Sequence, residues 1–392
     1  MTSHSSLSVL QIHNKKGIIF MRVLLCGGGT GGHVNPAIAI ANTIKNKKTD
    51  TVIEFIGTKH GIESSLVPNA GYKISFVKVK GFKRALSLSN IDAAIKAVTS
   101  VWAAKKIIKK FGPDLVIGTG GYVSWPTVKA ASKMGIPCLI HEQNAHPGVT
   151  TRMLSKYVNK ICISFEESRR FFEDSTGDKI ILTGNPINAV YYDYHQVRKE
   201  LGISDNEPYI LSYGGSMGAD KVNEYVFDLM ERYSIPLKIR HTHAVGRVGW
   251  EKYSAIAKEK GFNKKKNLEL TEFIYDMPKR QAAADIIIGR SGAITLAELS
   301  FRKKAAIFIP SPNVTDDHQF KNAKVLADAG AAIVFKESEL NGKILADTVK
   351  NLIENPNEIK RMEQSVKQFA KPDAASQIAD IAIKIANNKK KI

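Results

Sequence analysis

The stretch from Met21 to Pro36 places a histidine at the mouth of a glycine-rich turn. A short apolar run, Arg22–Cys26, leads into six residues of which five are glycine, and we expect a helix to open near His33. Glycine permits positive φ and lets a ligand approach the bare backbone, and the helix directs free N–H groups at that ligand. Histidine titrates near neutral pH and could serve there as a general base. The stretch indicates a site for an anionic or pyrophosphate-bearing substrate; a helix-capping histidine is the alternative.

This turn departs from the common nucleotide-binding signatures. No Gly-Lys-Ser/Thr follows it, so it is not a P-loop, and its glycines are denser than a dinucleotide fingerprint needs. Neither this turn nor the second one described below is followed, about twenty residues on, by a strand that ends in an acidic residue. Asp50 comes before its strand rather than after it. A nucleotide-dependent oxidoreductase is therefore a weak alternative.

The second half of the chain opens on a similar pattern. Tyr209–Tyr213 is apolar and is followed by the turn Gly214–Ala219 (GGSMGA) and a helix, so Ser216 could donate to a phosphate. Glu298 lies on the helix after Ser291 and Gly292, where a carboxylate can accept from two vicinal hydroxyls. A solvated glutamate on a helix face is the alternative for Glu298.

Polar residues also follow another strand of the first half. His141, Glu142 and Asn144 come directly after an apolar run, where active sites of α/β proteins lie, and Tyr122 stands in a further glycine turn. These residues extend the candidate site beyond the first turn.

Apolar runs of strand length alternate with helical stretches, such as Asn90–Lys110, through the whole chain. This alternation predicts the α/β class, with two doubly wound, Rossmann-like domains that face each other across a cleft. We expect strands at Arg22–Cys26, Thr51–Ile56, Lys73–Val79, Leu115–Gly118, Pro137–Ile140, Lys160–Ile163, Ile180–Leu182, Tyr209–Tyr213, Leu237–His241, Leu268–Leu270, Ile286–Ile288, Ala305–Ile309 and Ala331–Phe335.

Four segments are expected along the chain. Residues 1–20 form an N-terminal extension without ordered structure, so Met21 is either the initiator or follows that extension. Residues 21–185 form the first domain and residues 186–372 the second. Residues 373–392 form a C-terminal helix that we expect to pack back on the first domain.

The composition is that of an ordinary globular protein, with 43% hydrophobic and 24% charged residues and no apolar run long enough to span a membrane. Cys26, Cys138 and Cys162 show no metal-binding spacing, which favours reduced core thiols. His241 and His243 alternate on one strand, but without a third ligand they indicate core or surface histidines, so no metal is expected. The net charge of +20 points to anionic substrates or an anionic membrane rather than nucleic acid, because no nucleic-acid-binding motif is present. A generally basic proteome is the alternative explanation of that charge.

Several short strings in one order carry a family resemblance. GGGTGGHVNP, GTGGYVSWP, HEQNAHPG, GNP, GGSMGA, RSGAITLAE and DDHQFKNA follow one another from Gly27 to Ala323. With these strings the chain resembles the MurG family of peptidoglycan glycosyltransferases from about Met21 to the C-terminus. The resemblance implies the GT-B fold, no bound catalytic metal or other cofactor, and inverting transfer of N-acetylglucosamine (GlcNAc) from UDP-GlcNAc to lipid I, the undecaprenyl-diphospho-MurNAc-pentapeptide, which gives lipid II.

The resemblance also implies roles for individual residues. His33 would be the base toward the muramyl 4-hydroxyl, with Glu142 or His141 as the next candidates. The implied catalytic pair is His33 and Glu142, and the implied substrate-binding residues are Thr30, Gly31, Gly32, Tyr122, His141, Asn144, Asn188, Ser216, Ile274, Ala293, Ile294, Thr295, Leu296, Ala297, Glu298 and Gln319. Among these, Ser216 would contact the diphosphate, Ile274 the uracil, Glu298 the ribose, and Gln319 the GlcNAc hydroxyls.

Two positions depart from the family pattern. Asn188 stands where the family usually has an arginine that contacts the donor, so some of the charge for the diphosphate must come from elsewhere or be missing. His318 replaces a glutamine that commonly precedes Gln319, which leaves that second sugar contact open.

The segment Val79–Ile91 mixes Lys80, Lys83 and Arg84 with apolar side chains, a pattern that suits the surface of an anionic membrane. Inward packing of the apolar residues is the alternative. The resemblance implies a peripheral enzyme on the cytoplasmic face of the plasma membrane, with UDP-GlcNAc, lipid I, the membrane surface and other cell-wall synthesis proteins as partners.

Two further functions stay open at this point. A UDP-GlcNAc 2-epimerase uses the same two-domain fold, but would need neither a lipid contact nor the HEQNAHPG string. A non-catalytic protein that binds a sugar nucleotide or an anionic lipid is the other, although such a protein would not need both His33 and Glu298.

Overall fold

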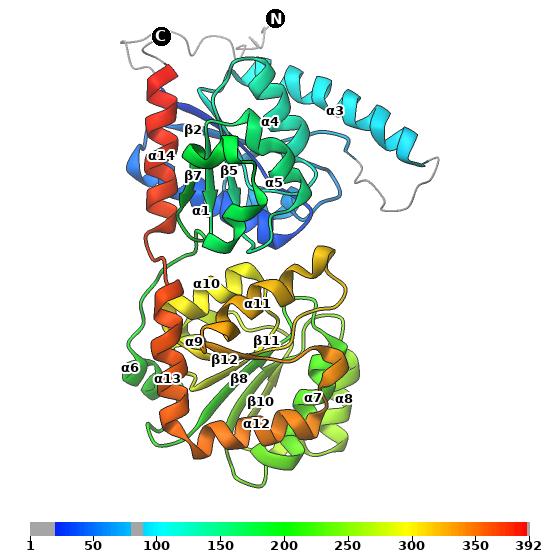
Figure 1. Cartoon of the computed structure of the whole chain (residues 1–392). Coiled ribbons are helices and arrows are strands. Elements are labelled where there is room, and N and C mark those ends of the chain that lie inside the picture. Colours follow the sequence, from blue (N-terminus) through cyan, green and yellow to red (C-terminus); the bar gives the residue numbers. More distant parts are fainter. Residues whose placement is uncertain (1–19, 80–88, 390–392) are drawn as a thin grey trace, which may run out of the picture.

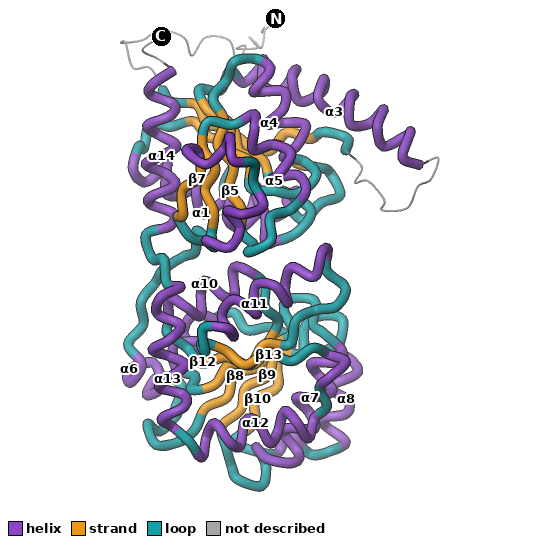
Figure 2. Tube along the Cα trace, viewed as in Figure 1, coloured by secondary structure: helices purple, strands orange, loops and turns teal. Residues whose placement is uncertain are grey.

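The computed structural model describes residues 20–79 and 89–389. They form two parallel sheets, each with helices on both faces, and the two units are stacked one above the other in Figures 1 and 2. The two doubly wound α/β domains expected from the alternating pattern are thereby confirmed. Residues 1–19 of the expected N-terminal extension, and the basic stretch 80–88, lie outside the described residues.

The N-terminal domain contains, within the described residues, a seven-stranded parallel sheet in the order β3-β2-β1-β4-β5-β6-β7. Its strands are β1 (Arg22–Cys26), β2 (Val52–Gly57), β3 (Lys73–Phe76), β4 (Leu115–Gly118), β5 (Cys138–Glu142), β6 (Lys160–Ile163) and β7 (Ile180–Leu182). Its helices are α1 (Gly31–Lys47), α2 (Glu63–Asn69), α3 (Ser89–Phe111), α4 (Ser124–Lys133) and α5 (Val149–Leu154). The central strands are mostly apolar because helices cover both of their faces; β4 and β5 are buried along their whole length, and β5 ends in the polar residues His141 and Glu142.

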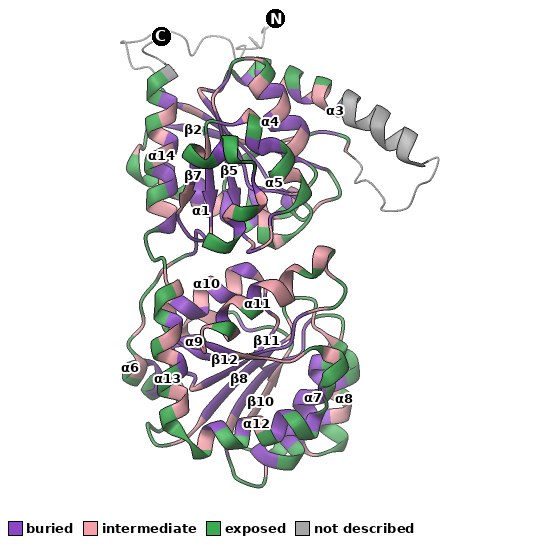
Figure 3. Cartoon of the chain, in the orientation of Figure 1, coloured by how far each residue is buried: buried purple, intermediate pink, exposed green. Residues whose placement is uncertain are grey.

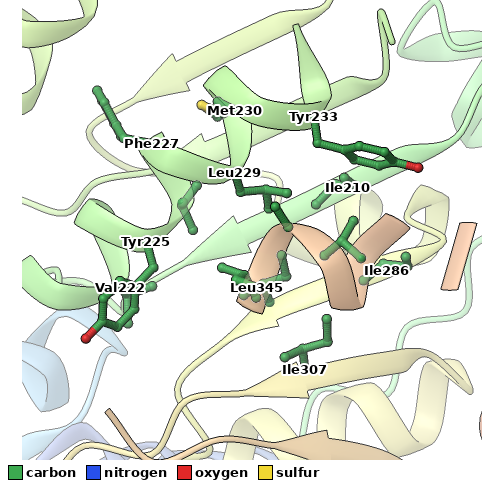
Figure 4. Packing of buried hydrophobic residues seen from close by; sticks show 14 of the residues in the cluster. Ile210, Val222, Tyr225, Phe227, Leu229, Met230, Tyr233, Ile286, Ile307 and Leu345 are labelled. Atoms are coloured by element: carbon green, nitrogen blue, oxygen red, sulfur yellow. The ribbon is translucent and has the colours of Figure 1, made fainter. Parts of the chain in front are cut away.

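The C-terminal domain has, in the described part of the chain, a six-stranded parallel sheet in the order β10-β9-β8-β11-β12-β13. Its strands are β8 (Tyr209–Tyr213), β9 (Arg240–Ala244), β10 (Leu268–Thr271), β11 (Ile286–Gly289), β12 (Ala305–Phe308) and β13 (Ala332–Val334). Its helices are α6 (Tyr194–Glu200), α7 (Asp220–Leu229), α8 (Trp250–Glu259), α9 (Met277–Ala283), α10 (Ala293–Arg302), α11 (His318–Asp328), α12 (Gly342–Glu354) and α13 (Pro356–Val366). Figure 4 shows the core on one face of this sheet, where Val222 and Leu229 of α7 and Leu345 of α12 lie over Ile210 and Ile286.

Both glycine-rich turns lie where the strand order reverses. The first follows β1, which has β2 on one side and β4 on the other, and the second follows β8, which lies between β9 and β11. In open parallel sheets the crevice for ligands forms at this point, outside the carboxyl ends of the strands. The topology therefore places each glycine turn where such a crevice forms.

The last helix, α14 (Ala374–Lys389), runs beside the N-terminal domain (Figure 1). Its buried stripe of Ile378, Ala379, Ala382 and Ala386 joins the apolar cluster formed by α1 and the strands beneath it (Figure 3). Asp380 also forms an ion pair with Lys47 at 2.7 Å. The chain thus crosses between the domains twice, once before α6 and once after α13.

One expected strand was wrong in its position. The apolar residues from Leu237 predicted a strand over Leu237–His241, but β9 is Arg240–Ala244. A π-helical turn, Met230–Ser234, extends α7, and the chain reverses at Lys238, which has a φ of 53°. Leu237 is 55% exposed in that reversal, so its apolar character did not mark a buried strand.

Cys26, Cys138 and Cys162 are free thiols buried in the N-terminal sheet. In residues 20–79 and 89–389, none of the helices combines the length and the apolar character needed to cross a membrane.

Candidate active site

His33 lies on the first turn of α1, and its ring is held by the glycine turn that precedes it. Its Nδ1 is 3.1 Å from the carbonyl oxygen of Gly28 and 3.2 Å from the Thr30 hydroxyl. A carbonyl oxygen can only accept, so Nδ1 carries the hydrogen of the bond to Gly28 and Nε2 keeps a lone pair in the neutral ring. The half-buried ring can therefore accept a proton at Nε2.

The pKa of His33 lies below its usual value, chiefly because burial disfavours the charged ring. Glu142, the bond to Gly28 and Glu63 act in the opposite direction, and His318 from α11 lowers the pKa further. His33 is consequently neutral at pH 7, which is the state a general base requires.

Glu63, on the first turn of α2, braces the same glycine turn and was missed from the sequence. Its side chain is fully buried, and its carboxylate accepts a hydrogen bond from the N–H of Gly29 at 3.0 Å. The other oxygen accepts from the N–H and the hydroxyl of Thr58 at 2.9 and 2.8 Å. The available signal was a charged residue among the glycines of GTKHGIES, directly after β2.

The turn after β4 packs against the first glycine turn. Thr119 donates its hydroxyl to the carbonyl of His33 at 2.7 Å, and Gly120 and Gly121 have positive φ. A Cβ at Gly120 would lie 2.6 Å from the His33 ring, so glycine is needed there for the histidine to fit. Tyr122 is 39% exposed and lies against Gly29. The structure thus brings Tyr122 and His33 together around one loop.

The loop after β5 is held by Glu142. One oxygen of its carboxylate accepts from the backbone N–H and the side chain of Asn144 at 3.0 and 3.1 Å, and the other accepts from the N–H of Gly148 at 3.1 Å. His141 is fully buried, and its Nε2 lies 3.0 Å from the carbonyl oxygen of Gly184. Burial lowers the pKa of His141 to about 4. These bonds place His141 and Glu142 where they hold the loop.

Asn144 and Asn185 lie at the boundary between the two domains. Asn322 of α11 is fully buried, donates to the Asn144 side chain at 3.0 Å and accepts from the N–H of Ala145 at 2.8 Å. Asn185, which follows β7, donates to the carbonyl of Ala293 at the start of α10, at 3.3 Å. The carboxyl ends of both sheets therefore meet at this boundary, and neither Asn185 nor Asn322 was among the residues predicted from sequence.

Ser216 is exposed in the second glycine turn, and its carbonyl accepts from the N–H of Arg247 at 3.2 Å. The turn is packed backbone against backbone, because a Cβ at Gly218 would lie 2.3 Å from the carbonyl oxygen of Val245. Asn188 is exposed in the segment that joins the domains. Ser216 is thus presented by the turn, whereas Asn188 lies outside both turns.

The other residues that the sequence predicts to bind the donor gather around α10. Helix α10 begins at Ala293 after Gly292, so the N–H groups of Ala293, Ile294 and Thr295 lie in its first turn. Burial raises the pKa of Glu298, and Arg302 and Gln281 partly offset this effect. Ile274 is buried and packs in the same cluster as Leu296.

Gln319 is tied to the loop beside α10. Its side-chain oxygen accepts from the N–H of Ser311 at 2.9 Å, and its carbonyl accepts from the hydroxyl of Ser291 at 3.0 Å. Leu296 and Ala297 line a cavity of about 20 Å³ at the domain boundary, which has room for a water molecule and not for a sugar. The neighbouring His318 donates from Nδ1 to the carbonyl of Thr315 at 2.8 Å.

The two histidines of β9 are core residues, which decides between the core and surface positions left open by the sequence. His241 and His243 are fully buried, and both are hydrogen-bonded to Ser212 at 2.8 Å. The remaining ring nitrogens bond to Ser234 and Asn223 at 3.0 and 3.1 Å. No cluster of three potential ligands occurs in residues 20–79 and 89–389.

Comparison with known proteins identifies the family. Residues 23–163 match the glycosyltransferase family 28 N-terminal domain, and residues 209–378 match the C-terminal domain of that family. A relative from Acetivibrio thermocellus is 41% identical over 371 residues, which cover 94% of this chain and 99% of the relative. It is named UDP-N-acetylglucosamine--N-acetylmuramyl-(pentapeptide) pyrophosphoryl-undecaprenol N-acetylglucosamine transferase. This chain belongs to the MurG family of glycosyltransferases.

Solved structures agree with the assignment. The crystal structure of Acinetobacter baumannii MurG has a TM-score of 0.74 to this chain at 30% identity, with 93% of this chain and 99% of that chain covered. UDP-GlcNAc 2-epimerase from Neisseria meningitidis has a TM-score of 0.62 at 18% identity, with coverage of 93% and 100%. At that identity the second likeness shows a shared fold alone. The MurG-family resemblance and the GT-B architecture predicted from sequence are thus confirmed.

Proposed function

We propose that this chain transfers GlcNAc from UDP-GlcNAc to the muramyl 4-hydroxyl of lipid I, with inversion, and forms lipid II. The observation that carries the proposal is the arrangement of two glycine turns at the switch points of two sheets, with His33 beside the first. The Acetivibrio thermocellus relative supports the donor and acceptor through its name. The reaction takes place at one site between the domains, where the N-terminal domain binds the acceptor and the C-terminal domain binds the donor.

In this reaction His33 acts on the acceptor. Nε2 takes the proton of the 4-hydroxyl while the oxygen forms a bond to C1 of GlcNAc. The bond from C1 to the diphosphate oxygen breaks on the opposite face, its electron pair leaves with UDP, and the anomeric configuration inverts. The bond from Nδ1 to Gly28 supports this step, since it keeps Nε2 unprotonated in the neutral ring.

The leaving diphosphate needs stabilisation, which backbone N–H groups at turns and helix starts can supply. We assign this role to Ser216 and its turn, to Thr30, Gly31 and Gly32, and to the first turn of α10 at Ala293, Ile294 and Thr295. Asn188 is exposed and its side chain is neutral. These N–H groups therefore contribute more to stabilising the diphosphate than they would in a relative with arginine at that position.

The rest of the donor lies along the C-terminal domain. Glu298 accepts from the ribose hydroxyls, and the backbone at Ile274 contacts the uracil. Gln319 and Asn144 contact GlcNAc from opposite domains, and the bond from Asn322 to Asn144 supports that placement because it already joins the two sides. Tyr122 contacts the acceptor. His141 acts on the acceptor side indirectly, because it holds the loop after β5.

The acceptor's lipid tail requires a membrane surface, and we propose the N-terminal domain for that contact, on the cytoplasmic face. The predicted membrane segment, Val79–Ile91, falls mainly outside the described residues. The helix that follows it, α3, exposes 61% of Trp102 with Lys106 at 3.5 Å above its ring, and Lys105 and Lys109 lie on the same helix. An exposed aromatic among lysines suits the interface of an anionic leaflet.

Transfer is tested by incubating the protein with radiolabelled UDP-GlcNAc and a lipid I analogue and measuring label in the lipid phase. We expect acceptor-dependent labelling with matching release of UDP. Release at the level of an acceptor-free control contradicts the proposal. Conversion of UDP-GlcNAc to its 2-epimer without acceptor would establish the epimerase alternative instead.

A further inference from the structure

Glu63 is a buried carboxylate that the transfer reaction described above does not use. It has no exposed surface, and its oxygens accept hydrogen bonds from Gly29 and Thr58. Burial alone would raise the pKa of Glu63, but the hydrogen bonds from Gly29 and Thr58 outweigh it and hold the pKa below its usual value. Glu63 is therefore ionised at neutral pH, in direct contact with the glycine turn.

Three glycines shape the space that this carboxylate fills. A Cβ at Gly28 would lie 2.6 Å from one carboxylate oxygen, and a Cβ at Gly61 would lie 2.2 Å from the other. A Cβ at Gly57 would lie 2.6 Å from the Cγ of Glu63. Any larger residue at these positions displaces the carboxylate, so part of the glycine content of this region serves Glu63 rather than a ligand.

One peptide group joins Glu63 to His33. The N–H of Gly29 donates to Glu63, and the C=O of Gly28 accepts from Nδ1 of His33. This N–H and this C=O belong to the same planar, conjugated peptide unit. Hydrogen bonds in a chain polarise one another, so a negative charge at the N–H end makes the C=O a stronger acceptor.

We propose that Glu63 is a positioning residue that acts on His33 through the Gly28–Gly29 peptide group. The carboxylate fixes the orientation of this peptide, and the peptide holds the hydrogen of His33 on Nδ1 and leaves Nε2 ready to accept. This role rests on the proposed function of His33 as the base. A direct carboxylate–histidine bond would place a charge beside the substrate, whereas the peptide keeps the charge buried.

Other groups also face His33. Glu142 lies at the end of β5, His318 comes from the start of α11, and the Thr30 hydroxyl shares Nδ1 at 3.2 Å. Tyr122 lies against Gly29, and burial and the charge of Glu63 both raise the pKa of Tyr122. A substitution at Glu63 leaves these side chains chemically unchanged, so it tests the contribution of Glu63.

The first experiment observes His33 directly in the unaltered protein. Nitrogen NMR of a 15N-histidine-labelled sample, assigned with the His33→Asn variant, should show His33 with hydrogen on Nδ1 and a bare Nε2. Neutral histidine in water favours the opposite tautomer, so the expected result is distinctive. A His33 with hydrogen on Nε2 overturns the proposal, whatever the enzyme's activity.

The second experiment compares Glu63→Gln with Glu167→Gln, which removes an exposed carboxylate of the same domain. In Glu63→Gln the pKa of His33 should fall, because a charge that stabilises the imidazolium is lost. The acid limb of kcat should move to lower pH and kcat at pH 7.5 should fall roughly tenfold, with donor KM unchanged. Glu167→Gln should change none of these.

Thr58→Val separates positioning from mere packing, since it removes one hydrogen bond to Glu63 and keeps the charge. We expect lower thermal stability with the pH profile unmoved. If Glu63→Gln and Thr58→Val both lose only stability and keep the same tautomer and pH profile, Glu63 is structural and the proposal is wrong. If transfer to lipid I is absent altogether, the proposed function fails, while the tautomer measurement still decides the role of Glu63.

Discussion

The two glycine turns of this protein occupy equivalent places in their sheets and are built differently. The turn before α1 is held by side chains: Glu63 binds the N–H of Gly29, His33 binds the carbonyl of Gly28, and Thr119 binds the carbonyl of His33. The turn after β8 is held by backbone, with Gly218 against the carbonyl of Val245. One turn thus carries groups that can move a proton, and the other presents N–H groups and a serine.

This difference matches the division of labour that transfer between two substrates requires. A base must sit near the acceptor, whereas the donor's diphosphate needs fixed donors that do not titrate. We therefore expect loss of the His33 side chain at the first turn to affect kcat, and loss of a donor contact in the C-terminal domain to affect donor binding.

The largest effect is expected for His33→Ala. Loss of a general base lowers kcat by roughly 10²–10⁴, and donor binding should stay near the parent value because the base acts on the acceptor. Steady-state kinetics with a lipid I analogue, together with UDP-GlcNAc titration calorimetry, measures both quantities. Near-normal turnover in the variant would move the base elsewhere.

A second prediction concerns acid stability of the C-terminal domain. Burial lowers the pKa of His243 to about 4 and that of His241 well below its usual value. The unfolded chain binds these protons from about pH 6.5 downward and the folded chain does not, so stability is lost as pH falls from about 6.5 toward 4. For His243 the loss amounts to about 3 kcal/mol over that range.

Thermal melting between pH 7.5 and 4.5 measures this loss. His243→Gln should flatten the pH dependence relative to the unaltered protein, because the variant lacks the buried imidazole. Equal slopes in the variant and the unaltered protein would contradict the assignment.

The third prediction places membrane binding on the first domain only. Changing Lys80, Lys83 and Arg84 to Glu should weaken binding to anionic vesicles by more than tenfold, because each basic residue near the surface contributes about 1 kcal/mol. Vesicle sedimentation measures binding, and activity on a short-chain, water-soluble acceptor should survive. Unchanged sedimentation of the triple variant would put the membrane face elsewhere.

The smallest effect is expected at the donor side. Glu298→Ala should raise the donor KM by roughly tenfold with acceptor KM near its parent value, since a ribose contact is made equally in ground and transition states. Initial rates with each substrate varied in turn check this. A rise in acceptor KM alone would refute the ribose assignment and remove the contrast between the two domains.

Much of the fold could be predicted because most of the buried parallel strands are largely apolar, although β9 buries two histidines and a threonine. Runs such as Arg22–Cys26 and Tyr209–Tyr213 are strands as expected, and the glycine turns follow them at the switch points. Local pattern was misleading where an apolar residue was exposed: Leu237 lies in a chain reversal, so β9 begins three residues later than predicted.

By itself, the sequence determined which family the chain belongs to, where the two turns lie and which histidine stands beside the first turn, because these features are written in consecutive residues. Only the tertiary structure decided which side chains hold the first glycine turn and the loop after β5 in place. Glu63 reaches Gly29 across 34 positions, and Asn322 reaches Asn144 across 178. Such pairs leave no local period or motif. They arise because parallel strands bring their carboxyl ends to one edge, and two domains then place those edges together.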